Sequence, residues 1–511
     1  MKPARLAFVG SVVGLVTAAL GIGVAHLVAG LIEPAASPIV AVGQVAIDLS
    51  PEPIKAWAIR VFGESNKAVL LAGIGTVLAA AAAALGAASI RRPSIATAAL
   101  VGFAAVGVTA ALVRQGAGPA DALPTLVGAL AAWLALLALR SWIPLPAADG
   151  ELEPSIEAID RRRVLIAGGG MALAAALAGG LGGLLARRAR ATASRAEVRI
   201  PVPGSASPPP TGADLAVPGL EPFHTPNGVF YRVDTALVVP SVEAEDWHLR
   251  IHGLVEREIS LDYATLLERP LIERDITLAC VSNPVGGPYV GNARWLGAPL
   301  RPLLEEVGVA PRADQIVTRS VDGFTIGTPT EIVMDGRDAM LAVAMNGEPL
   351  PLEHGFPVRM IVPGLYGYVS AMKWIVEMEL STFDAFDAYW VERGWAERAP
   401  IKTMSRIDTP RSNASLAPGP VTIAGVAWAQ HRGIERVEVR IDDGPWNEAE
   451  LAAEPTVDAW RQWRLPWDAT TGEHAIRVRA TDGEGDQQTP ERAEPFPDGA
   501  TGYHGVVVSV R

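Results

Sequence analysis

The stretch ITLACVSNPVGGPYVGNARWLGAPL, residues 276–300, contains Cys280, the only cysteine of the chain. A lone cysteine cannot form a disulfide within one chain, so it is a buried thiol, an unused thiol, or a thiolate that binds a soft metal. The β-branched run ITLAC predicts a strand that ends at the cysteine. The Asn-Pro, Gly-Gly and Gly-Asn pairs that follow predict a loop that can approach a cofactor closely. Cys280 is therefore well placed for a ligand, although buried structural thiols are the commoner case.

The two parts of the 511-residue chain differ in composition and charge. Residues 1–213 are rich in Ala, Leu, Gly and Val and carry a net charge of +6, whereas residues 214–511 have a mixed composition and a net charge of −18. An acidic soluble part argues against nucleic acid as a partner, because phosphates require a basic face. The sequence contains no CxxCH motif and no Cys/His cluster, which excludes c-type haem and a structural zinc site.

Five apolar runs in residues 1–190 predict an all-α transmembrane bundle, because a membrane-spanning helix requires about 20 apolar residues. These runs lie near residues 6–32, 68–90, 94–113, 122–140 and 164–186. None carries an acidic or basic residue in its middle third, which argues against a transporter. His26 is the only histidine of this region. A membrane-bound b haem normally needs two histidines, so we expect no haem.

The distribution of Lys and Arg predicts that the N-terminus lies in the cytoplasm. Eight basic residues fall in the segments that would then be cytoplasmic and four in the outer loops, which places the C-terminal part outside the cytoplasm, anchored in the cell membrane. The segment DRRRVLIAGGG, residues 160–170, is consistent with a twin-arginine export signal or with an ordinary basic anchor. Residues 191–222 are rich in Ala, Ser, Gly and Pro and predict a linker.

From residue 223 onward the pattern predicts short strands, turns and short helices. Residues 224–240 predict a turn at Asn227-Gly228 followed by a strand-like run, and residues 247–255 alternate as a half-buried strand. Helical spacing predicts short helices at 261–268 and 300–307. In the last hundred residues, the segments VTIAGVAW, RVEVRID, WRQWRLPW and HAIRVRATD alternate as the strands of a β-sandwich that packs rather than catalyses.

Residues 224–382 resemble the molybdopterin-binding domain of the sulfite oxidase family. The matched segments are FYR at 230–232, TLACVSN at 277–283, WLGAPLRPLL at 295–304, NGEPLPLEHGFPVRMIVPG at 346–364 and YGYVSAMKWI at 366–375. Residues 420–511 resemble the immunoglobulin-like (Ig-like) dimerisation domain that follows in many members, with GVAWAQHRGIERVEVRIDDGPWNEAEL as the most telling part. Because several long motifs occur in the right order, the resemblance is specific.

This resemblance implies a three-part fold. We expect an N-terminal all-α transmembrane bundle over residues 1–190 and, after the linker 191–222, an α+β molybdopterin-binding catalytic domain over residues 223–400. A C-terminal all-β Ig-like sandwich over residues 401–511 completes the expected fold class.

The resemblance also implies a metal site at Cys280. In the family a conserved cysteine ligates molybdenum beside the dithiolene of one molybdopterin, and a soft thiolate suits such a metal. The expected catalytic residues are Cys280, Tyr366 and Tyr368. The expected cofactor-binding residues are Asn227, Tyr231, Arg232, Cys280, Ser320, His354, Arg359, Ser370 and Lys373. Arg359 falls on a phosphate-binding arginine, whose planar fork suits a phosphate.

Without the order of the motifs, plainer interpretations of these residues would be preferred. Arg359 would be a strand-face salt bridge, His354 a turn residue and Tyr231 a core residue.

Two departures from the family pattern concern the substrate. Sulfite oxidases bind the sulfite dianion with arginines, one shortly after the cysteine and one in a GxRSxKW-like segment. Here Pro284 follows Asn283, and Val369 stands where the second arginine is expected. A desolvated sulfite would lack charge compensation without them. Tyr366, Tyr368 and Trp295 instead suggest a less charged pocket.

The sequence therefore predicts a membrane-anchored oxidoreductase with molybdenum, one molybdopterin per chain and an extracytoplasmic active site. Expected partners are membrane lipid, a separate redox partner (a cytochrome or a membrane electron carrier), a small-molecule or peptide-borne substrate and a second copy in a possible homodimer. The alternatives are a sulfite oxidase proper, a protein methionine-sulfoxide-type reductase, and a cofactor-free cell-surface binding module. Retention of Cys280, Arg359 and Lys373 together argues against the last.

Overall fold

The computed structural model describes residues 3–62, 65–89, 92–114, 116–141, 170, 187–207 and 211–511. The chain divides into two compact units. The first consists of Met1–Arg190 with Thr235–Pro240, and the second of Ala191–Asp234 with Ser241–Arg511. The short segment Thr235–Pro240 therefore belongs with the N-terminal helices, although it follows the first stretch of the second unit.

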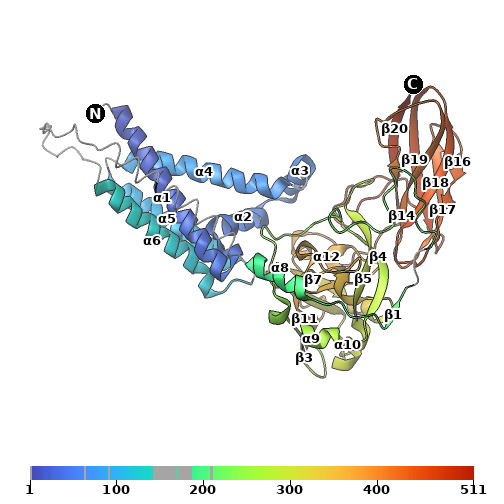
Figure 1. Ribbon diagram of the computed structural model, residues 1–511, viewed down its shortest axis with the longest axis horizontal. Coiled ribbons are helices and arrows are strands. Elements are labelled where there is room, and N and C mark those ends of the chain that lie inside the picture. Colours follow the sequence, from blue (N-terminus) through green and yellow to red (C-terminus); the bar gives the residue numbers. More distant parts are fainter. Residues whose placement is uncertain are drawn as a thin grey trace, which may run out of the picture. The chain divides into compact units, whose positions relative to one another are not determined.

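The first unit is helical, and its long helices are built mainly from Ala, Leu, Val and Gly (Figure 1). Its described helices are α1 (Pro3–Ile32), α2 (Pro38–Leu49), α3 (Glu52–Phe62), α4 (Asn66–Ser89), α5 (Pro93–Val113) and α6 (Leu123–Ser141). Four stretches are long and apolar enough to cross a membrane, namely Ala7–Ile32, Asn66–Ser89, Ser94–Val113 and Pro119–Leu139. They coincide with the first four predicted spans. The fifth predicted span, 164–186, lies outside the described residues apart from residue 170.

Glycines bring the backbones of these helices into direct contact. A Cβ atom on Gly128 of α6 would lie 2.5 Å from the carbonyl oxygen of Gly21 in α1. A Cβ atom on Gly86 of α4 would likewise overlap the carbonyl oxygen of Gly10 in α1. Helices in lipid gain no hydrophobic driving force from association, so close packing at small residues holds such bundles together.

The segment Thr235–Pro240 packs on two of these helices. Lys67, at the start of α4, donates a hydrogen bond from Nζ to the carbonyl oxygen of Ala236 at 2.7 Å. The Leu237 side chain would lie 2.9 Å from a Cβ atom on Gly43 of α2, so it fits closely against that helix. Both a polar and an apolar contact thus help to hold the segment.

The α+β region of the second unit, residues 191–234 and 241–403, contains two sheets with strand orders β1-β4-β5-β8-β10 (β9 pairs with β8) and β3-β2-β11-β6-β7. The first sheet consists of β1 (Ser205–Ala206), β4 (Ile272–Ala279), β5 (Val290–Pro299), β8 (Met340–Met345), β9 (Glu348–Pro349) and β10 (Arg359–Ile361). The second consists of β2 (His248–Gly253), β3 (Ile259–Asp262), β6 (Gln315–Ser320), β7 (Thr325–Pro329) and β11 (Ile375–Ser381). The helices are α8 (Arg187–Glu197), which begins in the first unit, α9 (Tyr263–Leu267), α10 (Leu300–Val307), α11 (Thr330–Met334) and α12 (Gly367–Ser370).

Most of the local elements predicted in this region are present. The strand predicted to end at Cys280 is β4, and the predicted helices correspond to α9 and α10. The strand-like run predicted within residues 224–240 is wrong, because no strand forms there. Its apolar side chains pack at separate places instead. Phe230 lies edge-on to Trp295, whereas residues 235–240 pack in the first unit.

The β-rich region, residues 404–511, contains a four-stranded sheet (β12-β14-β18-β17) and a five-stranded sheet (β13-β20-β19-β15-β16). The strands are β12 (Met404–Thr409), β13 (Ser415–Leu416), β14 (Gly419–Trp428), β15 (Ile434–Ile441), β16 (Trp446–Glu448), β17 (Glu450–Leu451), β18 (Arg461–Ala469), β19 (Gly472–Asp482) and β20 (His504–Val510). Ile423 and Trp463 of the first sheet share one buried core with Val437, Val478 and Val508 of the second. The four predicted alternating segments lie in β14, β15, β18 and β19 (Figure 1).

Strand β4 is held by both regions of the second unit. It pairs with β5 along its whole length. On its other edge, beyond the residues that pair with β1, the Thr277 amide donates to the carbonyl oxygen of Asp458 at 2.9 Å, and Gln430 donates to the Thr277 carbonyl oxygen at 2.8 Å. The Trp460 amide donates to the Thr277 hydroxyl at 2.7 Å. The strand that leads to Cys280 is therefore fixed on two sides.

The glycine contact between α1 and α6 can be tested with a matched pair of alanine substitutions. Alanine is about 1 kcal/mol more favourable than glycine in a helix interior. Gly102→Ala in α5, where a Cβ atom would meet nothing within 4 Å, should leave the melting temperature unchanged or raise it. Gly128→Ala should lower it by several degrees, because its Cβ atom meets the backbone of α1. Thermal unfolding of the full-length protein in detergent measures both, and equal shifts would contradict the expectation.

Candidate cofactor site around Cys280

Cys280 is half-buried and stands at the point where β4 gives way to a tightly bonded loop. Its amide donates to the carbonyl oxygen of Tyr289 at 2.9 Å, and its own carbonyl oxygen accepts from the Asn283 amide at 3.0 Å. The side chain of Asn283 accepts from the Tyr289 amide at 2.8 Å. Burial raises the pKa of the Cys280 thiol, an effect that hydrogen bonds from Ser282 oppose. Without a further positive charge the sulfur therefore stays protonated.

Arg359, the first residue of β10, is a buried cation without a counter-charge. Its Nη1 atom donates to the carbonyl oxygen of His354 at 3.2 Å, its guanidinium lies 5.1 Å from the ring centre of Trp295, and its Nε atom has no hydrogen-bond partner. Among the described residues no carboxylate pairs with it. Burial lowers its pKa to about 10, with Tyr231 acting in the opposite direction. Because a buried, unpaired charge is costly, this position favours an anionic ligand.

Lys373 lies beside Arg359, because the two residues pair across an antiparallel bridge. Its Nζ atom is 2.7 Å from Oδ2 of Asp234, a carboxylate that also accepts from Arg232 Nε at 2.8 Å. Burial lowers the pKa of Lys373 to about 8, and Asp234 opposes the shift. Lys373 and Arg232 thus share one carboxylate, and Arg359 lies beside Lys373.

His354 and Asn227 lie next to Arg359 and form one side of the candidate site. Nε2 of His354 donates to the carbonyl oxygen of Asn227 at 3.2 Å, and the side chain of Asn227 accepts from Asn346 at 2.9 Å. Gly355 has φ +108°, and a Cβ atom there would lie 3.1 Å from the Cβ atoms of Arg359 and Lys373. A glycine is therefore needed to bring the two cations so close to the turn.

Tyr231 lies near both Arg359 and Cys280. Burial raises its pKa, an effect increased by the nearby Cys280 and reduced by Arg359. A Cβ atom on Gly367, at the start of α12, would lie 3.9 Å from the Tyr231 hydroxyl and 3.6 Å from the carbonyl oxygen of Ala279. Tyr231, α12 and the end of β4 therefore converge.

The remaining predicted residues use their hydroxyls in local contacts. Ser370 donates to the carbonyl oxygens of Leu365 and Tyr366, both at 3.0 Å, and Ser320 bonds to Asp322. Tyr368 donates to the carbonyl oxygen of Ala396 at 2.5 Å.

The Tyr366 hydroxyl is also engaged by backbone, since it accepts from the Lys402 amide. Burial raises its pKa to about 12. The hydroxyls of the two predicted catalytic tyrosines are thus both bonded to main-chain atoms of the segment 396–402.

Sequence reasoning missed Asp234 and Asn346. The sequence did offer a signal for Asp234, because this residue lies two positions after Arg232 of the matched FYR segment. Asn346 is the first residue of the matched segment 346–364, but no local pattern indicates its contact with Asn227, 119 residues away.

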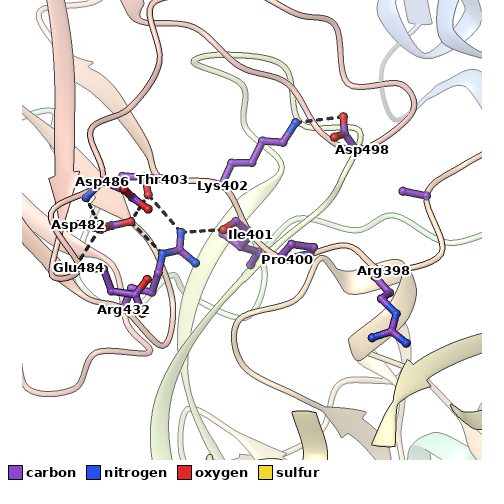
Figure 2. Close-up of a pocket in the computed structure, with 11 residues that line it drawn as sticks. Arg398, Pro400, Ile401, Lys402, Thr403, Arg432, Asp482, Glu484, Asp486 and Asp498 are labelled. Atoms are coloured by element: carbon purple, nitrogen blue, oxygen red, sulfur yellow. Dashed lines mark hydrogen bonds and ion pairs between the residues drawn. The ribbon is translucent and has the colours of Figure 1, made fainter. Parts of the chain in front are cut away.

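A cleft of about 490 Å³ lies between the segment 396–403 and the β-rich region (Figure 2). It is lined by Ala396, Arg398, Pro400, Ile401, Lys402, Thr403, Arg432, Asp482, Glu484, Asp486 and Asp498. Each lining cation has a carboxylate partner. Lys402 pairs with Asp498 at 3.0 Å and Arg432 with Asp482 at 2.9 Å, while Arg398 pairs with Glu331 at 2.8 Å. None of the cations that line the cleft is therefore free to pair with a small dianion.

Comparison with known proteins identifies the class of this domain. A family model described as oxidoreductase molybdopterin binding domain matches residues 236–390, which include Cys280, Arg359 and Lys373. Mitochondrial sulfite oxidase of Mus musculus is 30% identical over 310 residues, covering 52% of this chain and 55% of that protein. Sulfite oxidase of Gallus gallus is 31% identical over 314 residues, covering 52% and 66%. The chain thus spans between about half and two thirds of the length of these relatives.

A solved structure agrees with these relatives. Sulfane dehydrogenase SoxCD from Paracoccus pantotrophus is 25% identical, with a TM-score of 0.50, over 56% of this chain and 83% of that chain. The second unit therefore contains a molybdopterin-binding oxidoreductase domain. The chain belongs to the sulfite oxidase family of molybdopterin oxidoreductases, and this membership supports a molybdenum cofactor.

The buried imidazole of His354 generates a pH-dependent prediction. Burial, with smaller effects of Arg359 and Lys373, lowers its pKa from 6.5 to about 3. Between these values the unfolded chain binds a proton that the folded protein does not, so stability is lost as the pH falls through this window. His354→Asn should therefore lose less stability than the wild type, by on the order of 1–2 kcal/mol, when the pH falls from about 7 to about 5.

Melting temperatures of the cofactor-free protein at the two pH values measure this difference. His248→Asn, at an exposed position of β2, is the matched control. An equal acid response of His354→Asn and the wild type would contradict the prediction.

Proposed function

We propose that this protein is a membrane-anchored molybdenum-cofactor oxidoreductase with one molybdopterin per chain and an extracytoplasmic active site. The observation that carries the proposal is the buried guanidinium of Arg359, which has an unpartnered Nε atom and no carboxylate partner among the described residues. An anionic ligand would supply the missing charge, and a pterin phosphate matches the planar fork of arginine.

The residues near Arg359 and Cys280 suit all three parts of such a cofactor, namely the phosphate, the pterin and the metal. Arg359 would hold the phosphate, with Lys373 and Arg232 adding positive charge beside it. His354 and Asn227 would contact the pterin from their side of the site. Cys280, half-buried at the end of a strand fixed on both sides, would offer its sulfur to molybdenum. The positive charge of the metal would also favour the thiolate over the thiol.

The bound cofactor would supply two-electron chemistry, usually with transfer of an oxygen atom. The protein residues bind and orient it. The buried rings of Phe230 and Trp295 lie edge-on to each other and exclude water from the Arg359 side of the pocket. The bonded loop after Cys280 keeps its sulfur at the end of β4.

The substrate is proposed to carry less charge than sulfite. Pro284 and the buried Val369 occupy the positions at which the family resemblance implies arginines. The cations that line the neighbouring cleft are already paired. A small neutral molecule or a peptide-borne group fits these surroundings better than a dianion.

Two alternative substrates would undergo the same two-electron reaction with transfer of an oxygen atom. Sulfite oxidation is supported by the names of the Mus musculus and Gallus gallus relatives. Reduction of protein methionine sulfoxide is the second alternative that the family resemblance implies, although the exported, haem-free members that carry it out lack the Ig-like domain expected here.

The two units also support a proposal for the location and the partners. Four apolar helices would anchor the protein in the cell membrane. We expect no haem in the chain, so electrons would pass to or from a separate carrier, either a cytochrome or a membrane electron carrier. The two sheets of the β-rich region would form an Ig-like sandwich that supports a homodimer.

Cofactor analysis of the purified full-length protein tests the site. The wild type should contain one molybdenum and one pterin per chain. Arg359→Met should lose at least about tenfold in bound pterin, because a buried charged hydrogen bond to the phosphate is worth about 1.5–3 kcal/mol, and Arg359→Lys should lose less. Arg319→Met, which removes a partly exposed partner of Glu377, should retain the cofactor. Cys280→Ser should lose the visible absorption that sulfur-to-molybdenum charge transfer gives.

A wild-type chain without molybdenum or pterin would contradict the proposal and favour a cofactor-free binding module.

A turnover screen with artificial electron donors and acceptors tests the substrate class. Sulfite, small sulfoxides and protein-bound methionine sulfoxide are compared at equal concentration. We expect sulfite to turn over at least about tenfold more slowly than an uncharged substrate, because each missing charged contact costs at least about 1.4 kcal/mol. A fast sulfite rate would overturn the argument from Pro284 and Val369.

A further inference from the structure

The β-rich region contacts the loop that follows the cysteine. This loop, residues 281–289 and called here the Cys280 loop, receives a hydrogen bond from Arg406 of β12, whose Nη1 atom is 3.2 Å from the carbonyl oxygen of Gly287. Arg406 is buried, and its Nε atom is held by Asp408 at 2.6 Å. Its guanidinium is therefore fixed on one side by its own strand and on the other by the loop.

His504, the first residue of β20, covers the neighbouring residue of the loop. Its Nδ1 atom accepts from the Ile407 amide at 3.0 Å, so the ring is oriented by β12. Gly286 has φ +75°, and a Cβ atom there would overlap the imidazole ring. The ring thus lies directly on the Cα atom of Gly286, and only glycine fits both the backbone conformation and the space.

Hydrogen bonds within the loop connect these two contacts to the cysteine. The Gly287 amide donates to the carbonyl oxygen of Pro284 at 2.8 Å. Asn283, one residue earlier, bonds through its amide to the Cys280 carbonyl oxygen and through its side chain to Tyr289. Tyr289 in turn accepts from the Cys280 amide. A displacement at residues 286–287 would therefore be transmitted to Cys280 from both ends of the loop.

We propose that Arg406 and His504 are positioning residues for Cys280, through which the β-rich region sets where the sulfur stands. The proposal rests on the proposed function, because it assigns Cys280 as the metal ligand. It gives the β-rich region a role in the site beyond packing. The ion pair with Asp408 forms within one strand, so it does not explain why a buried guanidinium also reaches a loop 119 residues away.

The single cysteine provides a readout that needs no cofactor. Because Cys280 is the only cysteine, thiol alkylation of the cofactor-free, full-length protein by iodoacetamide occurs there, and its rate, followed by the loss of free thiol, reports how far the loop shields the sulfur. Arg406→Met keeps the length of the side chain but removes the hydrogen bonds, and it should raise the alkylation rate at least threefold. Arg406→Lys should give an intermediate rate. Gly286→Ala, which pushes the loop away from His504, should also raise the rate.

Arg436→Met is the matched control, because Arg436 is an exposed strand residue whose carboxylate partner, Glu438, is also two positions away. Its alkylation rate should equal that of the wild type. Circular dichroism and melting curves identify variants that unfold, and Arg406→Lys then replaces Arg406→Met in the comparison. Folded Arg406 and Gly286 variants that are alkylated at the wild-type rate would overturn the proposal.

The loaded protein gives a second readout. Arg406→Met should shift the electron paramagnetic resonance spectrum of the one-electron-reduced protein and lower kcat more than it raises KM. A loss of melting temperature without a spectral shift would mean that Arg406 is only structural. Absence of molybdenum from the wild type would contradict the proposed function, whereas the alkylation rates would still decide the role of Arg406.

Discussion

The burial of positive charge at Arg359 and Lys373 is the constraint on which the α+β region depends. Moving one charge from water into a protein interior costs several kcal/mol when it is unpaired. Asp234 compensates Lys373 and Arg232, and among the described residues no carboxylate compensates Arg359. The fold nevertheless places the two cations on adjacent backbone positions. Binding of a negatively charged ligand would offset this cost. Such a ligand would therefore raise the free energy of unfolding of the protein.

The same constraint explains what lies around the pocket. The face of Trp295 provides an electron-rich surface for the guanidinium. Gly355 allows a turn that a side chain would obstruct. Cys280 follows a strand, β4, whose edge opposite β5 is bonded to the β-rich region. The buried cations and the sulfur thus come from separate strands.

Local sequence patterns predicted the elements better than the contacts between them. The β-branched run before Cys280 and the spacing of residues 300–307 depend on neighbours in the chain, and both formed as expected. The order of the motifs also indicated that His354, Arg359 and Lys373 gather in one place. The roles of Tyr366 and Arg406 could not be predicted, because their partners, Lys402 and Gly287, are brought close only by tertiary folding. The strand expected near residue 230 failed for a similar reason, since its apolar side chains serve two different units.

The membership of Thr235–Pro240 in the first unit has a practical consequence for handling the protein. A truncated chain that begins after the helices would retain this segment but lose α2 and α4, against which it packs. Leu237 would then face water, and the Ala236 carbonyl oxygen would lose the lysine that now binds it. Exposed apolar segments of this kind promote self-association. A chain truncated in this way would therefore be easier to purify if Leu237 were replaced by a polar residue.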